Sequence, residues 1–359
     1  MINLLVAFFV AFIASIVIIR TQKLHGNFTG DSDLSGPQKF HTTPVPRIGG
    51  SAIFLGIFAP ITLNYQNNPQ ELTGLIFLIC LIPVMGIGIA EDLSKKVSPR
   101  VRLIFIALGA LLASLFLDAK INTLDIPGMD YLLSFSAVSI IFTMIAITGL
   151  ANAYNIIDGF NGLASMVGII TLMGLGYIGL QFQDSSMMYL SFLMASSILG
   201  FFLWNYPRGL IFLGDGGAYL IGFWVATLSV LMVCRHAEIS PWFALLLNGY
   251  PILETLFTIY RRVFHQGKSP GHPDGIHFHS LIYRRIHHHS SAVNNKDTFS
   301  ANAKTAPYLW ILSSLAVIPA ILFNNSTPKL VGFSLLFVAS YIWLYTRVAS
   351  FRTPKWLQL

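Results

Sequence analysis

Residues 212–232 read FLGDGGAYLIGFWVATLSVLM: three glycines surround one aspartate, and an apolar run long enough to cross much of a bilayer follows. A carboxylate at the edge of such a run is costly to desolvate unless it binds a partner of opposite charge. The missing side chains of the glycines around Asp215 would let a metal ion or a phosphate approach the backbone. A glycine kink in a transmembrane helix is the alternative, but it leaves the charge of Asp215 without a partner.

The composition of the chain is that of a membrane protein. Of its 359 residues, 54% are hydrophobic and only 10% are charged, which is too apolar for one soluble core. We therefore expect an all-α, polytopic integral membrane helix bundle with about eleven transmembrane helices, in a single domain over residues 1–359. The apolar runs near the ~20 residues needed to cross a bilayer are 2–19, 49–65, 72–90, 101–117, 132–151, 163–180, 187–205, 210–232, 241–260, 306–323 and 329–346.

The basic residues predict how these spans are oriented. Most of the 22 lysines and arginines lie in loops on one face, whereas Lys120, Arg235 and Lys329 lie on the other. Because basic loops stay in the cytosol, the N-terminus is expected outside and the C-terminus in the cytosol. Basic loops beside an anionic leaflet also explain the net charge of +7 without nucleic acid. The expected cytosolic loops are about 20–48, 91–101, 152–162, 205–216 and 261–305.

Five polar motifs lie at the predicted cytosolic ends of the spans. Carboxylates and amides beside a bilayer are expensive to desolvate unless they bind something charged, so we expect one shared site for a metal ion and phosphates. The motifs are Lys39-Phe40-His41 with Pro46-Arg47-Ile48-Gly49-Gly50; Glu91-Asp92; Asn152-Ala153-Tyr154-Asn155-Ile156-Ile157-Asp158-Gly159; Phe212-Leu213-Gly214-Asp215-Gly216-Gly217; and His272 with His277-Phe278-His279.

The second and third motifs each allow two interpretations. The pair Glu91-Asp92 can hold Mg²⁺ or take a proton from a nucleophile, or it can simply be the charged end of a helix. Asn152, Asn155 and Asp158 are spaced by three, which aligns them along one side of a helix. Such a stripe suits hydrogen bonding to a ligand, and helix capping is its alternative.

The late loop, residues 270–285, is rich in histidine and arginine. His277 and His279 suit zinc, but no cysteine lies nearby, and histidines with arginines also suit a diphosphate. The run 287–289 is three further histidines, which fit either a metal tract or an exposed linker. The sequence leaves these alternatives open.

Taken in this order, the motifs resemble those of the polyprenyl-phosphate N-acetylhexosamine-1-phosphate transferases (glycosyltransferase family 4), which include bacterial enzymes that start O-antigen, enterobacterial common antigen and teichoic-acid linkage synthesis. The resemblance covers roughly residues 36–286. It implies transfer of sugar 1-phosphate from a UDP-N-acetylhexosamine to undecaprenyl phosphate, with release of UMP and dependence on Mg²⁺, or on Mn²⁺ in its place. It also implies a multi-pass protein of the bacterial inner membrane with a cytosolic active site; a homodimer stays open.

The resemblance assigns a role to each motif residue. The implied metal ligand is Asp215, together with Asp92, which would also activate or position the lipid phosphate. The implied catalytic residues are Glu91, Asp92, Asp158, His277 and His279. The implied substrate-binding residues are Lys39, Arg47, Asn152, Asn155, Asn161, His272, Arg284 and Arg285.

The sequence departs from the family pattern at two positions. Glu91 replaces the usual first Asp of its pair, and Asn161 stands where many relatives have a second Asp. The late loop also lacks the His-His-His-Phe-Glu pattern of the muramoyl-pentapeptide branch, which favours a surface polysaccharide such as O-antigen over peptidoglycan. No residue decides which N-acetylhexosamine is used.

A transporter or flippase for a phosphorylated or lipid-linked substrate is the alternative from a different class. Transporters also place polar residues in broken helices, but their sites usually lie near the bilayer midplane. The five motifs are all predicted at the cytosolic boundary instead, which favours an enzyme.

Overall fold

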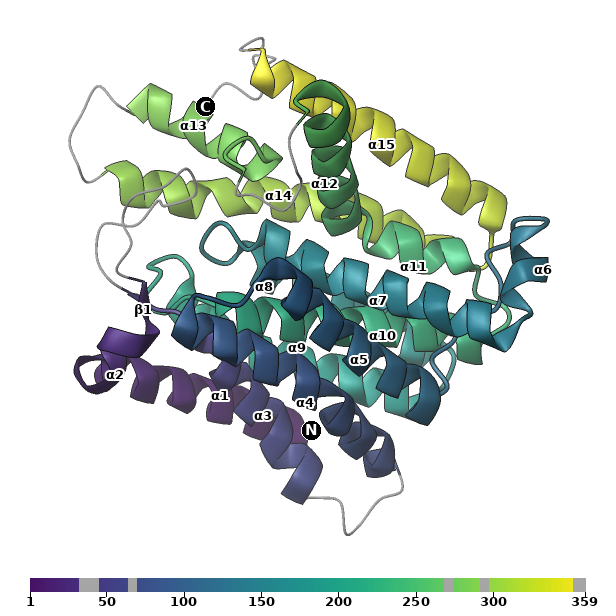
Figure 1. The fold of residues 1–359 in the computed structure, drawn as a ribbon, viewed down its shortest axis with the longest axis horizontal. Coiled ribbons are helices and arrows are strands. Elements are labelled where there is room, and N and C mark those ends of the chain that lie inside the picture. The colour runs from purple at the N-terminus through teal and green to yellow at the C-terminus, as the bar shows by residue number, and fades with distance from the viewer. Residues whose placement is uncertain (32–44, 64–69, 268–273, 291–296, 351–359) are drawn as a thin grey trace.

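The structure is a computed structural model that describes residues 1–31, 45–63, 70–267, 274–290 and 297–350, and they form a bundle of helices (Figure 1). The helices are α1 (Ile2–Arg20), α2 (Gln22–Thr29), α3 (Gly49–Leu63), α4 (Gln70–Ser94), α5 (Pro99–Phe116), α6 (Met129–Leu133), α7 (Ser136–Ile157), α8 (Leu163–Gln181), α9 (Ser185–Asn205), α10 (Gly214–Arg235), α11 (Pro241–Leu247), α12 (Gly249–Tyr260), α13 (Phe278–Ser290), α14 (Asp297–Leu322) and α15 (Thr327–Ala349). Two short strands, β1 (Gly30–Asp31) and β2 (Val45–Pro46), pair antiparallel.

The expected class, a polytopic helical membrane protein, is confirmed. Each of the eleven predicted apolar runs is mostly helical where the structure describes it, with breaks such as residues 134–135, 210–213 and 248. Among the described residues, nine helices are long and apolar enough to cross a membrane, and α11 with α12 forms a tenth candidate bent by 76°. The remaining apolar helix, α3, has only 15 residues. The number of eleven spans and their orientation therefore stay predictions.

Helix α10 lies at the centre of the bundle. It packs against α3, α4, α7 and α8. Within its apolar 18-residue stretch, 89% of the residues are buried, against 17% in the corresponding stretch of α1. Its sequence explains this position, because it is apolar on all sides and has no polar stripe to turn toward solvent. The first turn of α10, which carries Asp215, is consequently surrounded by the ends of other helices.

Glycines allow the helices to approach α10 closely. A Cβ atom on Gly88 of α4 would lie 2.4 Å from the Cα of Gly216, whereas a Cβ on Gly86 would meet nothing within 4 Å. Gly214 has φ +75°, and a Cβ there would lie 1.9 Å from the carbonyl oxygen of Arg47. Glycine at 88 and 214 thus brings the Glu91-Asp92 motif and the first loop against the start of α10.

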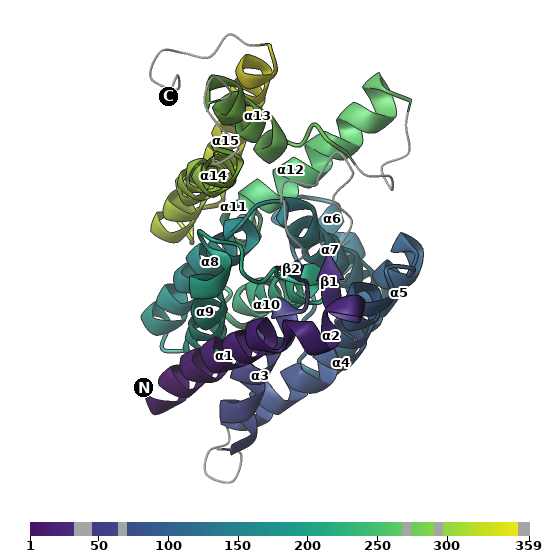
Figure 2. The same cartoon turned by 90° about the vertical axis from the view of Figure 1, so that its left-hand side faces the viewer.

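The C-terminal helices form a second layer beside this core (Figure 2). Helix α14 packs on α8, α12 packs on α7, and α13 lies against α14 and α15. The break between α11 and α12 falls at Asn248, whose Nδ2 donates to Ser229 Oγ and to the carbonyl of Ala244, each at 3.0 Å. The bend directs α12 and its π-helical continuation, Arg261–His265, toward the late loop.

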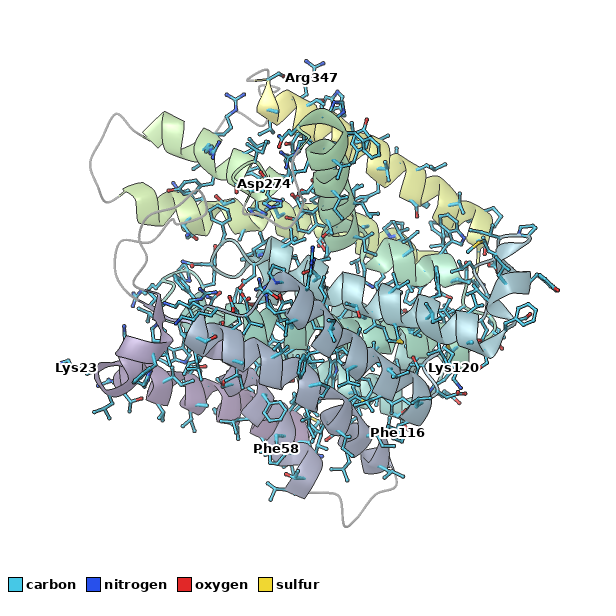
Figure 3. All side chains as sticks on the ribbon, in the orientation of Figure 1. Lys23, Phe58, Phe116, Lys120, Asp274 and Arg347 are labelled. Atoms are coloured by element: carbon cyan, nitrogen blue, oxygen red, sulfur yellow. The ribbon has the colours of Figure 1, made fainter. Side chains whose placement is uncertain are left out.

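The two ends of the bundle differ in the basic residues that they carry. Figure 3 shows Lys23 and Lys120 at opposite ends of the molecule. Lys95, which follows Asp92 in sequence, donates from Nζ to the carbonyl of Gly30 at 2.7 Å and so lies at the α2 end with Lys23. This separation agrees with the predicted assignment of Lys23 and Lys120 to opposite faces of a membrane.

Candidate active site

The carboxylate of Asp215 joins four parts of the chain at the first turn of α10. Its Oδ1 accepts from Nδ2 of Asn155 at 3.1 Å and from Nη2 of Arg47 at 3.4 Å. Its Oδ2 forms an ion pair with Nη1 of Arg102. The Asp215 side chain keeps 13% of its surface exposed, so the cluster is nearly buried but still reachable. The expected meeting of the first, third and fourth motifs is therefore present.

The carboxylate of Asp92 caps α10. Its Oδ1 accepts from the backbone N–H of Asp215 at 2.7 Å, and its Oδ2 accepts from that of Gly216 at 2.9 Å. These N–H groups lie at a helix start, where no backbone acceptor is available, and a negative charge there also interacts favourably with the helix dipole. Only 2% of Asp92 is exposed. Its geometry is that of a group that holds the Asp215 turn in place.

Glu91 and Arg102 connect the acidic pair to the start of α5. Glu91 Oε2 accepts from the backbone N–H of Val97 at 2.8 Å, and its Oε1 lies 3.8 Å from Arg102 Nη1. Arg102 thus lies between the carboxylates of Glu91 and Asp215. From the sequence alone, Arg102 is only one of the basic residues that predict the orientation of the spans. Its position in the first turn of a helix that follows an acidic pair could have identified it as a site residue.

Asp158 ends α7 beside this cluster. Burial, and then the negative charge of Asp215, raise its pKa to about 7, while the positive charge of Arg47 opposes the shift. Asp158 can therefore hold or release a proton near neutral pH. Asn155, one turn earlier, reaches Asp215, whereas Asn152 lies half-buried on the same helix without a described contact to that carboxylate.

Asn161 lies in the turn between α7 and α8 and holds it to its neighbours. Its backbone N–H donates to Asn302 Oδ1 and its Nδ2 donates to the carbonyl of Pro207, both at 3.1 Å. Asn205 Oδ1 accepts from the next backbone N–H, that of Gly162, at 2.6 Å. Asn161 thus makes hydrogen bonds that maintain the loop, and its expected contact with a nucleotide stays a prediction.

The late histidines lie against the Asp158 turn from the other layer. The rings of His277 and His279 stack with centroids 5.1 Å apart and an interplanar angle of 20°. Both are buried, with 5% and 2% exposed. A Cβ on Gly159 would lie only 2.8 Å from His279 Nε2, so a larger residue at 159 would displace the ring where the Asp158 turn meets the start of α13. The fifth motif therefore joins the same region as the third.

Burial and nearby charges shift the pKa values of His279 and Asp274 in this region. Burial, and then the charge of His277, lower the pKa of His279 to about 3, so its ring is neutral at physiological pH. Asp274 forms an ion pair with Arg261. Burial alone would raise the pKa of Asp274, but the hydrogen bond from Arg261 and the charge of His277 outweigh it and lower the pKa.

Several predicted residues lie outside this description. Lys39 and His272 are not among the described residues, and the side chains of 287–289 are not described either. Arg284 is exposed on α13, and Arg285 is half-buried on the same helix. Their expected roles in substrate binding stay predictions.

The described donors fit a shared Mg²⁺ better than a zinc ion. In the part of the chain that the structure describes, no group of three or more His, Cys, Asp or Glu residues could hold a metal ion by itself. Mg²⁺ is commonly bound through one or two carboxylates, with substrate phosphates and water completing its coordination. Asp215, with Asp92 behind it and Asp158 beside it, offers carboxylates of that kind at a nearly buried site.

Comparison with known proteins shows a similarity to one family. The model of glycosyl transferase family 4 matches residues 74–233, which include the acidic pair and Asp215. The chain is 28% identical over 284 residues to the probable undecaprenyl-phosphate N-acetylglucosaminyl 1-phosphate transferase of Bacillus subtilis, covering 79% of this chain and 78% of that protein. This match and this similarity support the family that the motifs predicted, glycosyl transferase family 4.

Two further relatives are similar to the chain, one of them over nearly its whole length. The undecaprenyl-phosphate alpha-N-acetylglucosaminyl 1-phosphate transferase of Thermotoga maritima is 29% identical over 282 residues, covering 79% of this chain and 80% of that protein. The Haemophilus influenzae protein of the same name is 25% identical over 365 residues, covering 99% of this chain and 97% of its own length. The latter similarity includes the late histidine loop.

We expect Asp158 to make folding stability fall as the pH rises. Its folded pKa of about 7 exceeds the ordinary value of 3.8, so its favourable contribution is complete below 3.8 and is lost as the pH rises through 7. Asp158→Asn should therefore reduce the difference in Tm between about pH 5 and about pH 8, measured in detergent with a metal chelator. The exposed Glu238 provides a control variant, Glu238→Gln. If the Tm difference between the two pH values is the same in Asp158→Asn as in the unaltered protein, the raised pKa assigned to Asp158 is contradicted.

Proposed function

We propose that this protein is a Mg²⁺-dependent enzyme that transfers N-acetylhexosamine 1-phosphate from a UDP-sugar to undecaprenyl phosphate and releases UMP. The observation that carries the proposal is the meeting of Asp92, Asp158, Arg47 and Arg102 around Asp215 at one end of a membrane bundle. The printed names of the relatives, which are undecaprenyl-phosphate N-acetylglucosaminyl 1-phosphate transferases, support the same reaction.

The charges of the site suit a reaction between two phosphates. A lipid phosphate must approach the β-phosphate of the UDP-sugar, and the two anions repel unless cations lie between them. Arg47 and Arg102 supply two cations that already face Asp215. We propose that they bind the diphosphate, and that Asp215 holds Mg²⁺, which when bound would polarise the diphosphate and stabilise the departing UMP.

The proposed step is direct attack by the lipid phosphate. An oxygen of undecaprenyl phosphate forms a bond to the β-phosphorus, and the bond from that phosphorus to the bridging oxygen of UMP breaks. A phosphate is largely ionised near neutral pH, so it needs positioning more than deprotonation. Both oxygens of Asp92 accept N–H groups of α10, which favours a positioning role over nucleophilic attack by this carboxylate. Asp158, with a pKa of about 7, is the group suited to hold a proton beside the reacting phosphates.

We also propose that the site faces the cytosol of a bacterial plasma membrane and starts a cell-surface polysaccharide. Support for the orientation comes from Lys23 and the Asp92 loop, which share the end that the basic residues predict to be cytosolic. The donor sugar is proposed only as an N-acetylhexosamine; UDP-N-acetylglucosamine is the first to test, because the relatives' names contain it.

The direct test uses purified full-length protein, undecaprenyl phosphate, Mg²⁺ and a panel of labelled UDP-N-acetylhexosamines. We expect label to enter the lipid phase in equal amount to released UMP, and only with a divalent cation, with Mn²⁺ compared with Mg²⁺. Absence of product with every donor, in protein shown to be folded, would contradict the transferase and favour the transporter or flippase.

We expect Arg102→Met to lower kcat/KM for the UDP-sugar by about 10- to 100-fold, because a hydrogen bond to a charged group contributes about 1.5–3 kcal/mol. Arg100→Met is the matched control, since Arg100 lies on the same turn of α5 but is exposed. It should remain within about twofold of the unaltered protein, as is usual for exposed sites. Equal losses in the two variants would indicate a general effect of basic residues near the membrane.

A further inference from the structure

Glu254 is a buried carboxylate that none of the five motifs contains. It lies on α12, just after the bend at Asn248, and has no exposed surface. Its Oε1 lies 3.1 Å from His277 Nδ1 and accepts from the backbone N–H of Phe278 at 3.1 Å. Its Oε2 accepts from the hydroxyl of Tyr341 at 2.8 Å. One carboxylate therefore joins α12, the start of α13, and α15.

These contacts determine which nitrogen of His277 carries the hydrogen. An ionised carboxylate can only accept hydrogen bonds, and bonds from N–H and O–H groups favour that ionised form. Nδ1 of His277 must then be the donor toward Glu254. The hydroxyl of Thr258, 3.1 Å from the same nitrogen, can accept as well. Whenever the ring is neutral, its hydrogen is consequently held on Nδ1.

The other ring nitrogen is then the one available for chemistry. Nε2 of His277 lies 4.0 Å from Asp274 Oδ2, too far for a hydrogen bond, and that oxygen is already paired with Arg261. Among the described residues, His279 is a further titratable neighbour, and its ring stacks on that of His277. In Figure 3, Asp274 lies where α12 and α13 approach each other. His277 is thus oriented through Nδ1 by Glu254, and no hydrogen bond to a described residue engages Nε2.

We propose that Glu254 is a positioning residue for the transferase: it fixes His277 in the Nδ1–H tautomer, so that Nε2 is presented to the phosphates of the substrate. The proposal rests on the proposed function for the role of Nε2, but the tautomer itself can be measured without any activity. In metal sites and catalytic triads, carboxylates fix histidine tautomers in the same way.

A purely structural role for Glu254 makes different predictions. The carboxylate fastens three helices, so its loss can lower stability even if the histidine is unaffected. Glutamine separates the two roles. Its amide oxygen can replace Oε1 and accept from His277 and Phe278, while its NH₂ group donates to the Tyr341 hydroxyl, which rotates to accept. Leucine has a similar volume and can accept nothing.

The experiment compares Glu254→Leu, Glu254→Gln and Tyr341→Phe in the full-length chain. Nitrogen NMR of ¹⁵N-histidine at alkaline pH reports the tautomer, and His277→Gln assigns the signal. We expect Nδ1–H in the unaltered protein, in Glu254→Gln and in Tyr341→Phe, and a shift toward Nε2–H in Glu254→Leu. In the same proteins, we expect Glu254→Leu to lower kcat about 10- to 100-fold and to leave KM for the UDP-sugar nearly unchanged. In Glu254→Gln, kcat should be largely restored.

The outcomes separate the inference from the proposed function. Finding His277 as Nε2–H in the unaltered protein would overturn the inference, even if no variant folds. An unchanged tautomer in folded Glu254→Leu would overturn it as well. If the unaltered protein transfers no sugar phosphate but the tautomer responds as expected, the proposed function fails while the Glu254–His277 contact stands.

Discussion

The carboxylate of Asp215 is the contact on which the rest of the site depends. It contacts Asn155 of α7, Arg47 of the segment before α3, and Arg102 of α5. Asp92 of α4 accepts a hydrogen bond from the backbone N–H of Asp215 and so holds this turn in place. A charge in this position at the edge of an apolar helix is stable only because these partners surround it. Removing Arg47 or Arg102 would leave the charge of Asp215 less compensated, whereas removing Asn155 would take away a hydrogen bond without changing the charge.

The second layer brings the histidines to this cluster, and the bend at Asn248 makes that possible. A straight helix through α11 and α12 would continue along the bundle, whereas the 76° bend turns α12 toward α13. Glu254 then holds the start of α13 through the backbone N–H of Phe278, so that His279 lies against Gly159. The position of the histidine loop therefore depends on a buried carboxylate in the neighbouring helix.

Much of this arrangement follows from the sequence, because apolar runs specify helices and polar motifs at their ends specify where a site forms. The eleven runs are mostly helical where the structure describes them, and the motifs of Asp92, Asp158 and Asp215 meet as expected. The bend at Asn248 was not predicted, since an asparagine inside an apolar run has no unique effect on helix direction.

Arg102 and Glu254 were not predicted as site residues from the sequence. Arg102 follows other basic residues at a predicted cytosolic end, where positive charge is expected for topology alone. Glu254 lies outside every motif, although an acid within the apolar run 241–260 was a signal for a functional residue. Both depend on contacts between distant segments, 102 with 215 and 254 with 277, which a single sequence does not reveal.

The central proposal is that the carboxylate of Asp215 organises the site and would hold the metal for phosphoryl transfer. The most direct measurement compares Asp215→Asn with the unaltered protein for Mg²⁺-dependent formation of lipid-linked sugar, at equal amounts of folded protein. Asparagine keeps the shape and the contacts to the α10 cap but removes the charge. The account predicts a loss of kcat of at least about 100-fold with the membrane fold retained, in line with the loss of one transition-state contact. Full activity in Asp215→Asn would contradict it.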